Sequence, residues 1–188
     1  MNAQPLSTVA KNLVLPIVER DHIQGPTDAP LALVEYGDYE CPRCGAAYPI
    51  VKAVQEQLGD RLCFAFRNFP LMNAHPHSAR AAEAAEAAGA QGGFWPMHDM
   101  LFENQGALED RHFAKYARKL GLDADRLIAD LTNATHTLRV REDIRSGARA
   151  GVNGTPTFFV NGVRYDGLLN EDALFTNLVA KARTAPIN

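Results

Sequence analysis

The feature of this sequence that most limits its fold is a double change of hydrophobic period along the chain. Residues 31–36 and 61–66 are short apolar runs of the kind that form buried strands. Between them, residues 42–58 carry apolar side chains at helical spacing, and Gly59 ends that segment. A strand–helix–strand unit of this kind predicts two parallel strands joined by a right-handed crossover.

The pattern then becomes helical and later returns to strands. Strand character reappears at residues 157–160 and 163–165, and the Asn161-Gly162 pair between them predicts a type I′ hairpin. A last helix is expected at 170–183. The predicted fold is therefore α/β, with an all-helical insertion between the two halves of a sheet domain. The segments expected to be helical within the insertion are 75–90, 94–104, 109–120, 123–131 and 135–150.

These patterns suggest a division of the chain. Residues 1–30 form an N-terminal extension with a candidate edge strand at 14–20, although Pro16 weakens that assignment. Residues 31–70 and 151–188 form the sheet domain, and 71–150 form the helical insertion.

Composition excludes several classes of partner. The 188 residues include 19 basic and 22 acidic side chains, so the formal charge of -3 gives no attraction to nucleic acid or to an anionic membrane. No apolar run is long enough to span a bilayer. The N-terminus lacks a signal-peptide pattern. The expected location is therefore the cytoplasm as the sequence stands, or a periplasmic or other extracytoplasmic site if a leader preceded Met1.

The chemistry is expected at Cys41-Pro42-Arg43-Cys44, between the first strand and its helix. A helix N-terminus favours an anion and so lowers the pKa of Cys41, and Arg43 adds a nearby cation. Cys41 is expected to be the accessible attacking thiol, and Cys44, one turn further, the shielded thiol that resolves a mixed disulfide. This predicts a redox centre that needs no metal and no organic cofactor.

The cysteines also allow other interpretations. Cys63 lies in an apolar run and is expected to be a small buried hydrophobe. A CxxC motif is half of a zinc site, and although no second CxxC is present, histidines and Cys63 could complete one. The competing hypothesis is thus a non-catalytic binding module.

Two motifs together resemble the DsbA-like branch of the thioredoxin superfamily. They are Val-Glu-Tyr-Gly-Asp-Tyr-Glu-Cys-Pro-Arg-Cys at 34–44 and Gly-Thr-Pro-Thr-Phe-Phe-Val-Asn-Gly at 154–162, and the likeness extends from about Leu31 to the C-terminus. The resemblance implies a thioredoxin-like fold with a helical insertion. It also implies a thiol:disulfide oxidoreductase that acts on protein or peptide thiols and has a redox partner. The Pro42-Arg43 dipeptide departs from the commoner Pro-His or Pro-Tyr, so oxidase, reductase and isomerase directions stay open, with oxidation favoured.

The resemblance also implies roles outside the CxxC. Thr155 and Pro156 are expected to form a cis-proline loop that lies against the CxxC and pairs with the substrate backbone; in the competing hypothesis this loop only docks peptides. Glu35 corresponds to an acid that takes protons from the inner cysteine. The alternative for Glu35 is an edge-strand carboxylate with its head in solvent.

Two acids and two histidines are also expected to lie close to the CxxC. Asp38 and Glu40 are expected to be solvated charges at the rim that oppose thiolate formation. His75 and His77 either flank the mouth of the site or pack at the start of a helix.

Overall fold

A computed structural model describes residues 16–184 of the protein. Its five strands form one sheet in the order β1-β3-β2-β4-β5. β2 and β3 are parallel, as the strand–helix–strand pattern predicts, and the other neighbouring pairs are antiparallel. The strands are β1 (His22–Gln24), β2 (Leu31–Gly37), β3 (Leu62–Asn68), β4 (Thr157–Val160) and β5 (Val163–Tyr165).

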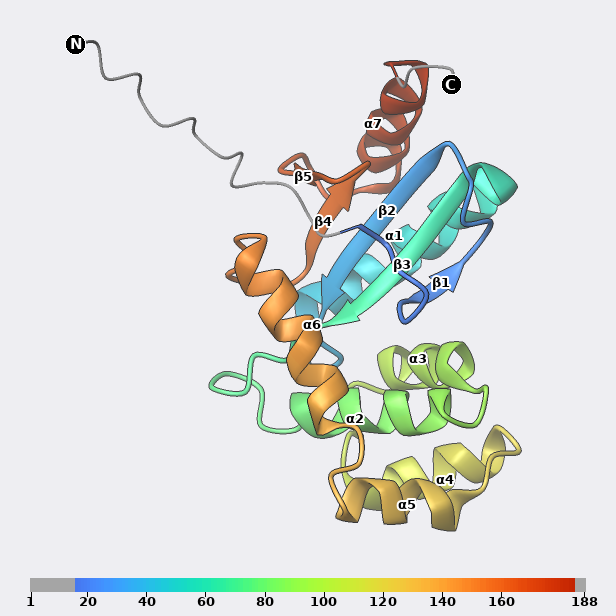
Figure 1. Ribbon diagram of the computed structural model, residues 1–188, viewed down its shortest axis with the longest axis vertical. Coiled ribbons are helices and arrows are strands. Elements are labelled where there is room, and N and C mark those ends of the chain that lie inside the picture. The colour runs from blue at the N-terminus through green and yellow to red at the C-terminus, as the bar shows by residue number, and fades with distance from the viewer. Residues whose placement is uncertain (1–15, 185–188) are drawn as a thin grey trace, which may run out of the picture.

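Helices cover both faces of the sheet and one of its ends. α1 and α7 pack on one face, α6 crosses the other, and α2 to α5 gather beyond the carboxyl ends of β2 and β3 (Figure 1). None of the described helices is both long and apolar enough to cross a membrane. The helices are α1 (Pro42–Leu58), α2 (Ser78–Gly89), α3 (Phe94–Glu103), α4 (Asp110–Lys119), α5 (Ala124–Thr132), α6 (Thr137–Arg149) and α7 (Glu171–Thr184).

The strands divide the core in two because successive side chains of a strand point to opposite faces. Leu33 and Phe64 belong to a cluster that continues from α1 into the helices beyond the sheet. Val34 and Ala65 belong to a smaller cluster on the face that α6 covers. The insertion and the sheet therefore share one hydrophobic core, and the end of β2 lies where they meet.

The predicted hairpin between β4 and β5 is confirmed. Asn161 and Gly162 have φ values of 47° and 78°, both positive as a type I′ turn requires. Val160 pairs with Val163 across the turn.

The predicted N-terminal edge strand is wrong for the part that the structure describes. Residues 16–20 form no strand; instead, Asp21 closes a turn in which its backbone N–H donates to the Val18 carbonyl and its carboxylate accepts from the Val18 N–H, each at 2.8 Å. Residues 14 and 15 lie outside the described range. The edge strand is β1, where His22 pairs with Phe66 of β3.

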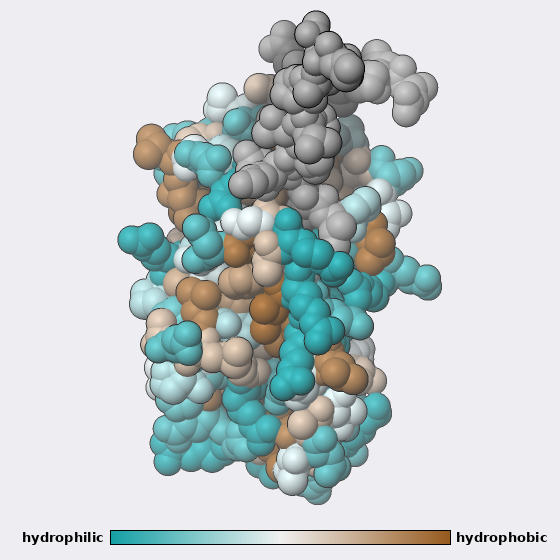
Figure 2. Space-filling model, turned by 60° about the vertical axis from the view of Figure 1, so that its left-hand side comes forward, coloured by the Kyte–Doolittle hydropathy of each residue, from teal (hydrophilic) through white to brown (hydrophobic). Residues whose placement is uncertain are grey.

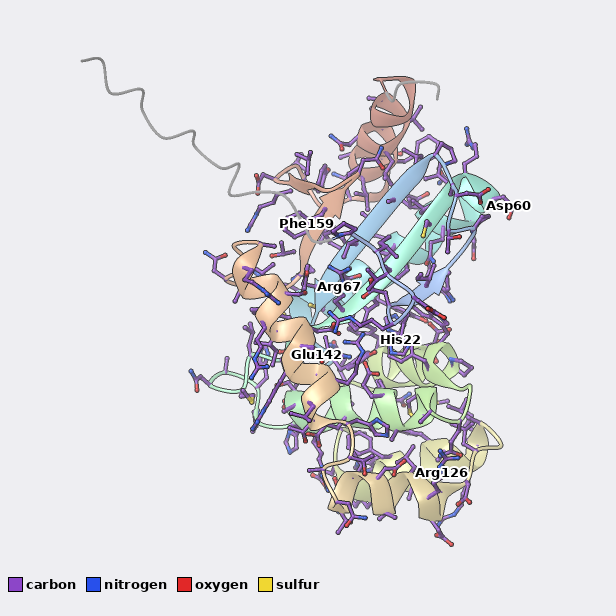
Figure 3. The ribbon with its side chains drawn as sticks, viewed as in Figure 1. His22, Asp60, Arg67, Arg126, Glu142 and Phe159 are labelled. Carbon is purple, nitrogen blue, oxygen red and sulfur yellow. The ribbon has the colours of Figure 1, made fainter. Side chains whose placement is uncertain are left out.

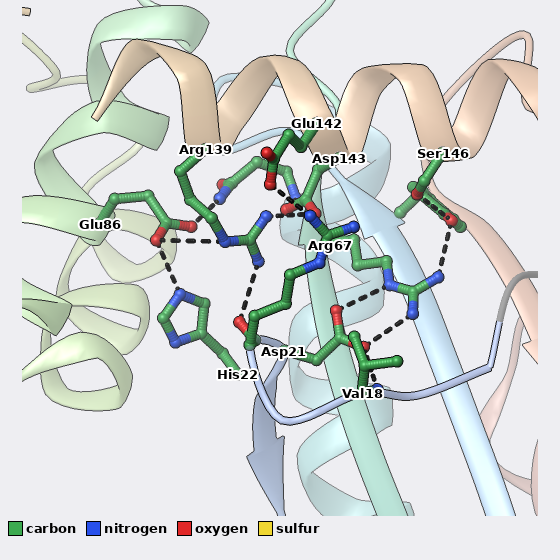
Figure 4. Close-up of polar contacts among 12 residues, drawn as sticks. Val18, Asp21, His22, Arg67, Glu86, Arg139, Glu142, Asp143 and Ser146 are labelled. Carbon is green, nitrogen blue, oxygen red and sulfur yellow. Dashed lines mark hydrogen bonds and ion pairs between the residues drawn. The ribbon is translucent and has the colours of Figure 1, made fainter. Parts of the chain in front are cut away.

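A buried polar network ties α6 to the sheet (Figure 4). The Arg67 guanidinium makes two bonds to the Asp21 carboxylate, at 2.7 and 3.0 Å, and a third to the Tyr36 hydroxyl at 2.9 Å. That hydroxyl lies 2.7 Å from Ser146 Oγ on α6. Figure 3 shows Arg67 between the sheet and this helix. Because both ions are almost fully buried, this pairing fixes how the N-terminal segment and α6 lie on the sheet.

The surface in Figure 2 is mixed in character, with brown hydrophobic side chains in separate patches between teal ones. Exposed large apolar residues of the described chain are spread over distant segments and include Met72, Leu138 and Leu168. On this face, apolar surface is therefore divided rather than gathered into one broad patch.

Candidate active site

The CxxC motif lies where the sequence predicts it, at the junction of β2 and α1. Cys41 immediately precedes the helix with an extended backbone (φ -72°, ψ 120°), and Pro42 is the first helical residue, a position that suits proline because its missing N–H has no partner there. Cys44 lies within the first turn. All three cysteines of the chain are free thiols.

Cys41 is less accessible than the sequence analysis predicts. Its exposed fraction is 5%, against 0% for Cys44. The reason is the loop before β4: Cys41 Sγ lies 3.4 Å from the Thr155 carbonyl oxygen. The loop therefore covers part of the Cys41 sulfur.

The two thiols have opposite acidities. The pKa of Cys41 is lowered to about 5, chiefly by its hydrogen bond with the Cys44 side chain; burial opposes this, and hydrogen bonds with Thr155 and with the backbone of Cys44 and Arg43 lower it further. Burial, and then the same bond to Cys41, raise the pKa of Cys44 far above its usual value. At neutral pH the arrangement therefore holds a thiolate at Cys41 and a thiol at Cys44.

Arg43 acts differently from its expected role. Its side chain is exposed, and it lowers the pKa of Cys41 through its backbone N–H rather than as the nearby cation that the sequence suggests. The helix start thus lowers the pKa of Cys41 chiefly through the Cys44 side chain, and to a smaller extent through the backbone N–H groups of Arg43 and Cys44.

The loop before β4 faces Cys41. The Thr155–Pro156 peptide bond is cis, as the resemblance implies. The buried Thr155 hydroxyl interacts with the Cys41 sulfur, whose pKa it helps to lower. A cavity of about 230 Å³ adjoins the loop, and its lining includes Pro156, Thr157 and Tyr165. The Thr155 carbonyl is thus the backbone group of this loop that lies next to the Cys41 sulfur.

Glu35 is buried rather than exposed at an edge. It lies in β2 between Phe66 of β3 and Phe158 of β4, and only 3% of its surface is exposed. Burial, followed by the negative charge of Cys41, raises its pKa to about 8. Its own charge in turn helps to raise the pKa of Cys44. A carboxyl group that keeps its proton at neutral pH therefore lies close to both thiols.

The expectation that Asp38 is a solvated rim charge is wrong. Asp38 is 1% exposed, and its carboxylate accepts from the backbone N–H groups of Glu40 and Leu71 and lies 2.8 Å from His75 Nδ1. Glu40 is partly buried and pairs with the ring and the backbone N–H of His77. Both acids therefore join the segment before the CxxC to residues 71–77.

One residue that the sequence does not single out also supports the site. The Gln105 side-chain amide, from the loop after α3, donates to the Tyr39 carbonyl at 2.8 Å and to the Cys41 carbonyl at 2.9 Å. It lies so close to α1 that a Cβ at Gly45 would stand 2.0 Å from its Oε1. Only the absence of a side chain directly after Cys44 hints at this contact.

Within residues 16–184, no group of three or more His, Cys, Asp or Glu side chains is placed to hold a metal ion.

Comparison with known proteins identifies relatives over nearly the whole chain. A family model described as Thioredoxin matches residues 18–179. The Na(+)/H(+) antiporter NhaA 1 of Salinispora arenicola is 45% identical over 181 residues, which cover 93% of this chain and 27% of that protein. The Na(+)/H(+) antiporter NhaA of Herminiimonas arsenicoxydans is 44% identical over 165 residues, 88% of this chain and 26% of that protein. The chain thus spans about a quarter of the length of these relatives.

Solved structures share the fold almost completely. BdbD from Bacillus subtilis superposes with a TM-score of 0.82 at 24% identity, over 92% of this chain and 98% of that one. A thioredoxin-like oxidoreductase from Silicibacter pomeroyi gives 0.78 at 26% identity, over 90% and 95%. The alpha-DsbA1 protein of Wolbachia pipientis gives 0.76 at 19% identity, over 90% and 96%. With this fold and the family match, the chain belongs to the thioredoxin family.

Proposed function

We propose that the chain exchanges disulfides with protein or peptide thiols through Cys41 and Cys44, and that it acts in the oxidising direction. The observation that carries this proposal is the pairing of a thiolate at Cys41 with a protonated Cys44. A stable thiolate is a good leaving group, so a disulfide that contains Cys41 passes readily to another thiol.

In the oxidised enzyme, a substrate thiolate attacks Cys41 Sγ and the Cys41–Cys44 bond breaks. The bond's electron pair leaves on Cys44, which must then take up a proton because its own pKa is high. The protonated Glu35 carboxyl is the nearby group that supplies this proton.

A second substrate thiolate then attacks the substrate sulfur of the mixed disulfide. This forms the substrate disulfide and releases Cys41 as its stabilised thiolate, so two electrons have passed from the substrate to the enzyme. A redox partner takes these electrons when the Cys41–Cys44 disulfide forms again. Disulfides made in this way persist in an oxidising compartment, which favours an extracytoplasmic location.

The substrate chain is proposed to lie along the loop at Thr155 and Pro156. The Thr155 carbonyl is 3.4 Å from Cys41 Sγ, so an extended peptide bonded to this loop would bring its own sulfur to Cys41. The cavity next to Pro156 gives room for one flanking side chain.

The antiporter name of the curated relatives does not change this proposal. It describes proteins of which this chain matches about a quarter. We propose that the matching segment contributes thiol chemistry, not ion exchange, in those longer proteins as well.

The test is the trapping of a covalent intermediate. Cys44→Ser should accumulate a mixed disulfide between Cys41 and a peptide supplied in its disulfide form, visible by mass spectrometry: the Cys41 thiolate opens the peptide disulfide and releases one peptide thiol, and the Cys44 thiol that would resolve the product is gone. Cys63→Ser is the matched control and should turn over as the unaltered protein does, since Cys63 lies on the other face of β3. Normal turnover by the Cys44→Ser protein would contradict the assigned roles.

A further inference from the structure

One residue, Asp38, joins a histidine to the thiol that we propose as the nucleophile. Its carboxylate lies 2.8 Å from His75 Nδ1, and its backbone carbonyl accepts from the Cys41 N–H at 3.1 Å. A backbone hydrogen bond from Asp38 also reaches Cys44. Asp38 is thus the single residue that bonds both to the His75 ring and to the two cysteines.

The backbone of His75 is held by hydrogen bonds on both of its sides. Its backbone N–H donates to the Leu71 carbonyl at 2.9 Å, and its carbonyl accepts from the backbone and the hydroxyl of Ser78. The Asp38 carboxylate can only accept, so Nδ1 carries a proton and a second proton on Nε2 makes the ring a cation. With 18% of the side chain exposed, the ring can exchange that second proton with solvent.

The charged groups that face the His75 ring are all negative. Asp38, Glu40 and Cys41 face it from the segment before α1 and from the start of that helix, and each favours the cation. His77 is the other titratable group of its own loop, and it is paired with Glu40.

We propose that His75 is a positioning residue of the dithiol centre, whose cationic form supports the Cys41 thiolate and withdraws that support when the ring loses its proton to solvent. This inference rests on the proposed dithiol–disulfide function and adds its regulation by pH. The Asp38 bond raises the pKa of His75, with the Cys41 charge adding to it. Coupling is reciprocal, so the thiolate that favours the cation is favoured by it to the same extent. The support is complete below the ordinary histidine value of about 6.5 and disappears as pH rises through the raised value.

The first experiment uses the unaltered protein. NMR titration of the histidine rings should place the His75 midpoint about half a unit or more lower in the oxidised protein than in the reduced one, because oxidation removes the Cys41 charge. His136 is the internal control: it also pairs with a carboxylate, Asp130, and its side chain is also 18% exposed, but it lies on the far side of the insertion. Equal His75 midpoints in the two redox forms would overturn the inference.

The second experiment separates charge from position. In His75→Asn the side-chain amide can still donate to Asp38 but carries no charge, so the Cys41 thiolate absorbance at 240 nm should titrate about half a unit to one unit higher. His136→Gln should leave that titration unchanged. Failure of the inference can be told apart from failure of the proposed function. If only the inference fails, the unaltered protein still forms a reducible Cys41–Cys44 pair and turns over, while the Cys41 thiolate of His75→Asn titrates at the same pH as that of the unaltered protein.

Discussion

The acidity of Cys41 predicts that the two redox forms exchange their order of stability near neutral pH. Only the reduced form has the thiolate, so only it gains stability from a lowered pKa. A cysteine lowered from about 8.5 in the unfolded chain to about 5 in the folded one stabilises the folded protein by about 2.7 kcal/mol at pH 7. Solvent at the mouth of the site screens part of this gain, so we expect about 2 kcal/mol.

The same pKa values give the pH dependence. Because the folded pKa is depressed, the stabilisation is complete above about pH 8.5 and is lost as pH falls through about 5; at pH 4.5 only about 0.2 kcal/mol remains. The disulfide instead contributes about 1.9 kcal/mol at every pH, the loop-closure entropy of a four-residue loop. The oxidised protein should thus be more stable by about 1.7 kcal/mol at pH 4.5, the two forms should be nearly equal at pH 7, and the reduced form should be more stable at pH 8.

The assay is urea denaturation of both forms at pH 4.5, 7 and 8, with a phosphine reductant that acts in acid. The difference between the two unfolding free energies cancels most other titrating groups. The Glu35→Gln protein serves as a control, because Glu35 itself titrates in this range. An oxidised form that stays more stable by a constant margin from pH 4.5 to 8 would refute the thiolate argument and the oxidising direction with it.

Two further changes test the buried charges. Glu35→Gln should raise the free energy of unfolding at pH 7 by about 1–3 kcal/mol, because a carboxyl with a folded pKa of about 8 must take up a proton on folding, at a cost that grows from about pH 4.3 to 8. The same variant should also slow disulfide exchange with a model dithiol. A variant no more stable than the parent would show that the carboxylate has a stabilising partner. Arg67→Met should lower the free energy of unfolding by about 3–5 kcal/mol, since it leaves the Asp21 carboxylate buried without its cation. The exposed pair of Arg20 and Glu142 supplies the control, because Arg20→Met should change the free energy of unfolding by about 1 kcal/mol or less. Equal effects of Arg67→Met and Arg20→Met would contradict the burial argument.

Much of this fold could be predicted because its signals are local. The strand at 31–36, the helix at 42–58 and the Asn161-Gly162 hairpin each depend on spacing or turn chemistry within a few residues, and all three are present. β1 could not be found in this way: His-Ile-Gln has a single apolar residue, too few to show a strand period, and its pairing with β3 defines it.

Site residues, too, can be predicted only where their signal is local in the sequence. Cys41 and Cys44 are visible in the sequence because a strand, a CxxC and a helix follow one another. The burial of Asp38 cannot be predicted from the sequence because its partners, Leu71 and His75, come from a loop more than thirty residues away and are brought to it only by tertiary folding. Gln105 carries no motif at all, since an amide becomes informative only when the carbonyl groups that it bonds are known.

The alternation of side chains along β3 also determines which sulfur atoms can meet. Phe64 and Phe66 point into the cluster that contains Cys41 and Cys44, whereas Cys63 points to the opposite face, into a cavity lined by Ala32 and Val34. The sheet thus lies between the Cys63 thiol and the thiols of Cys41 and Cys44. A mixed disulfide at Cys41 has one thiol within the folded chain that can compete for it, Cys44, and scrambling with Cys63 would require the sheet to open. The alternation of side chains along β3 thereby keeps Cys63 from forming a disulfide with Cys41 or Cys44, although the chain retains this third cysteine.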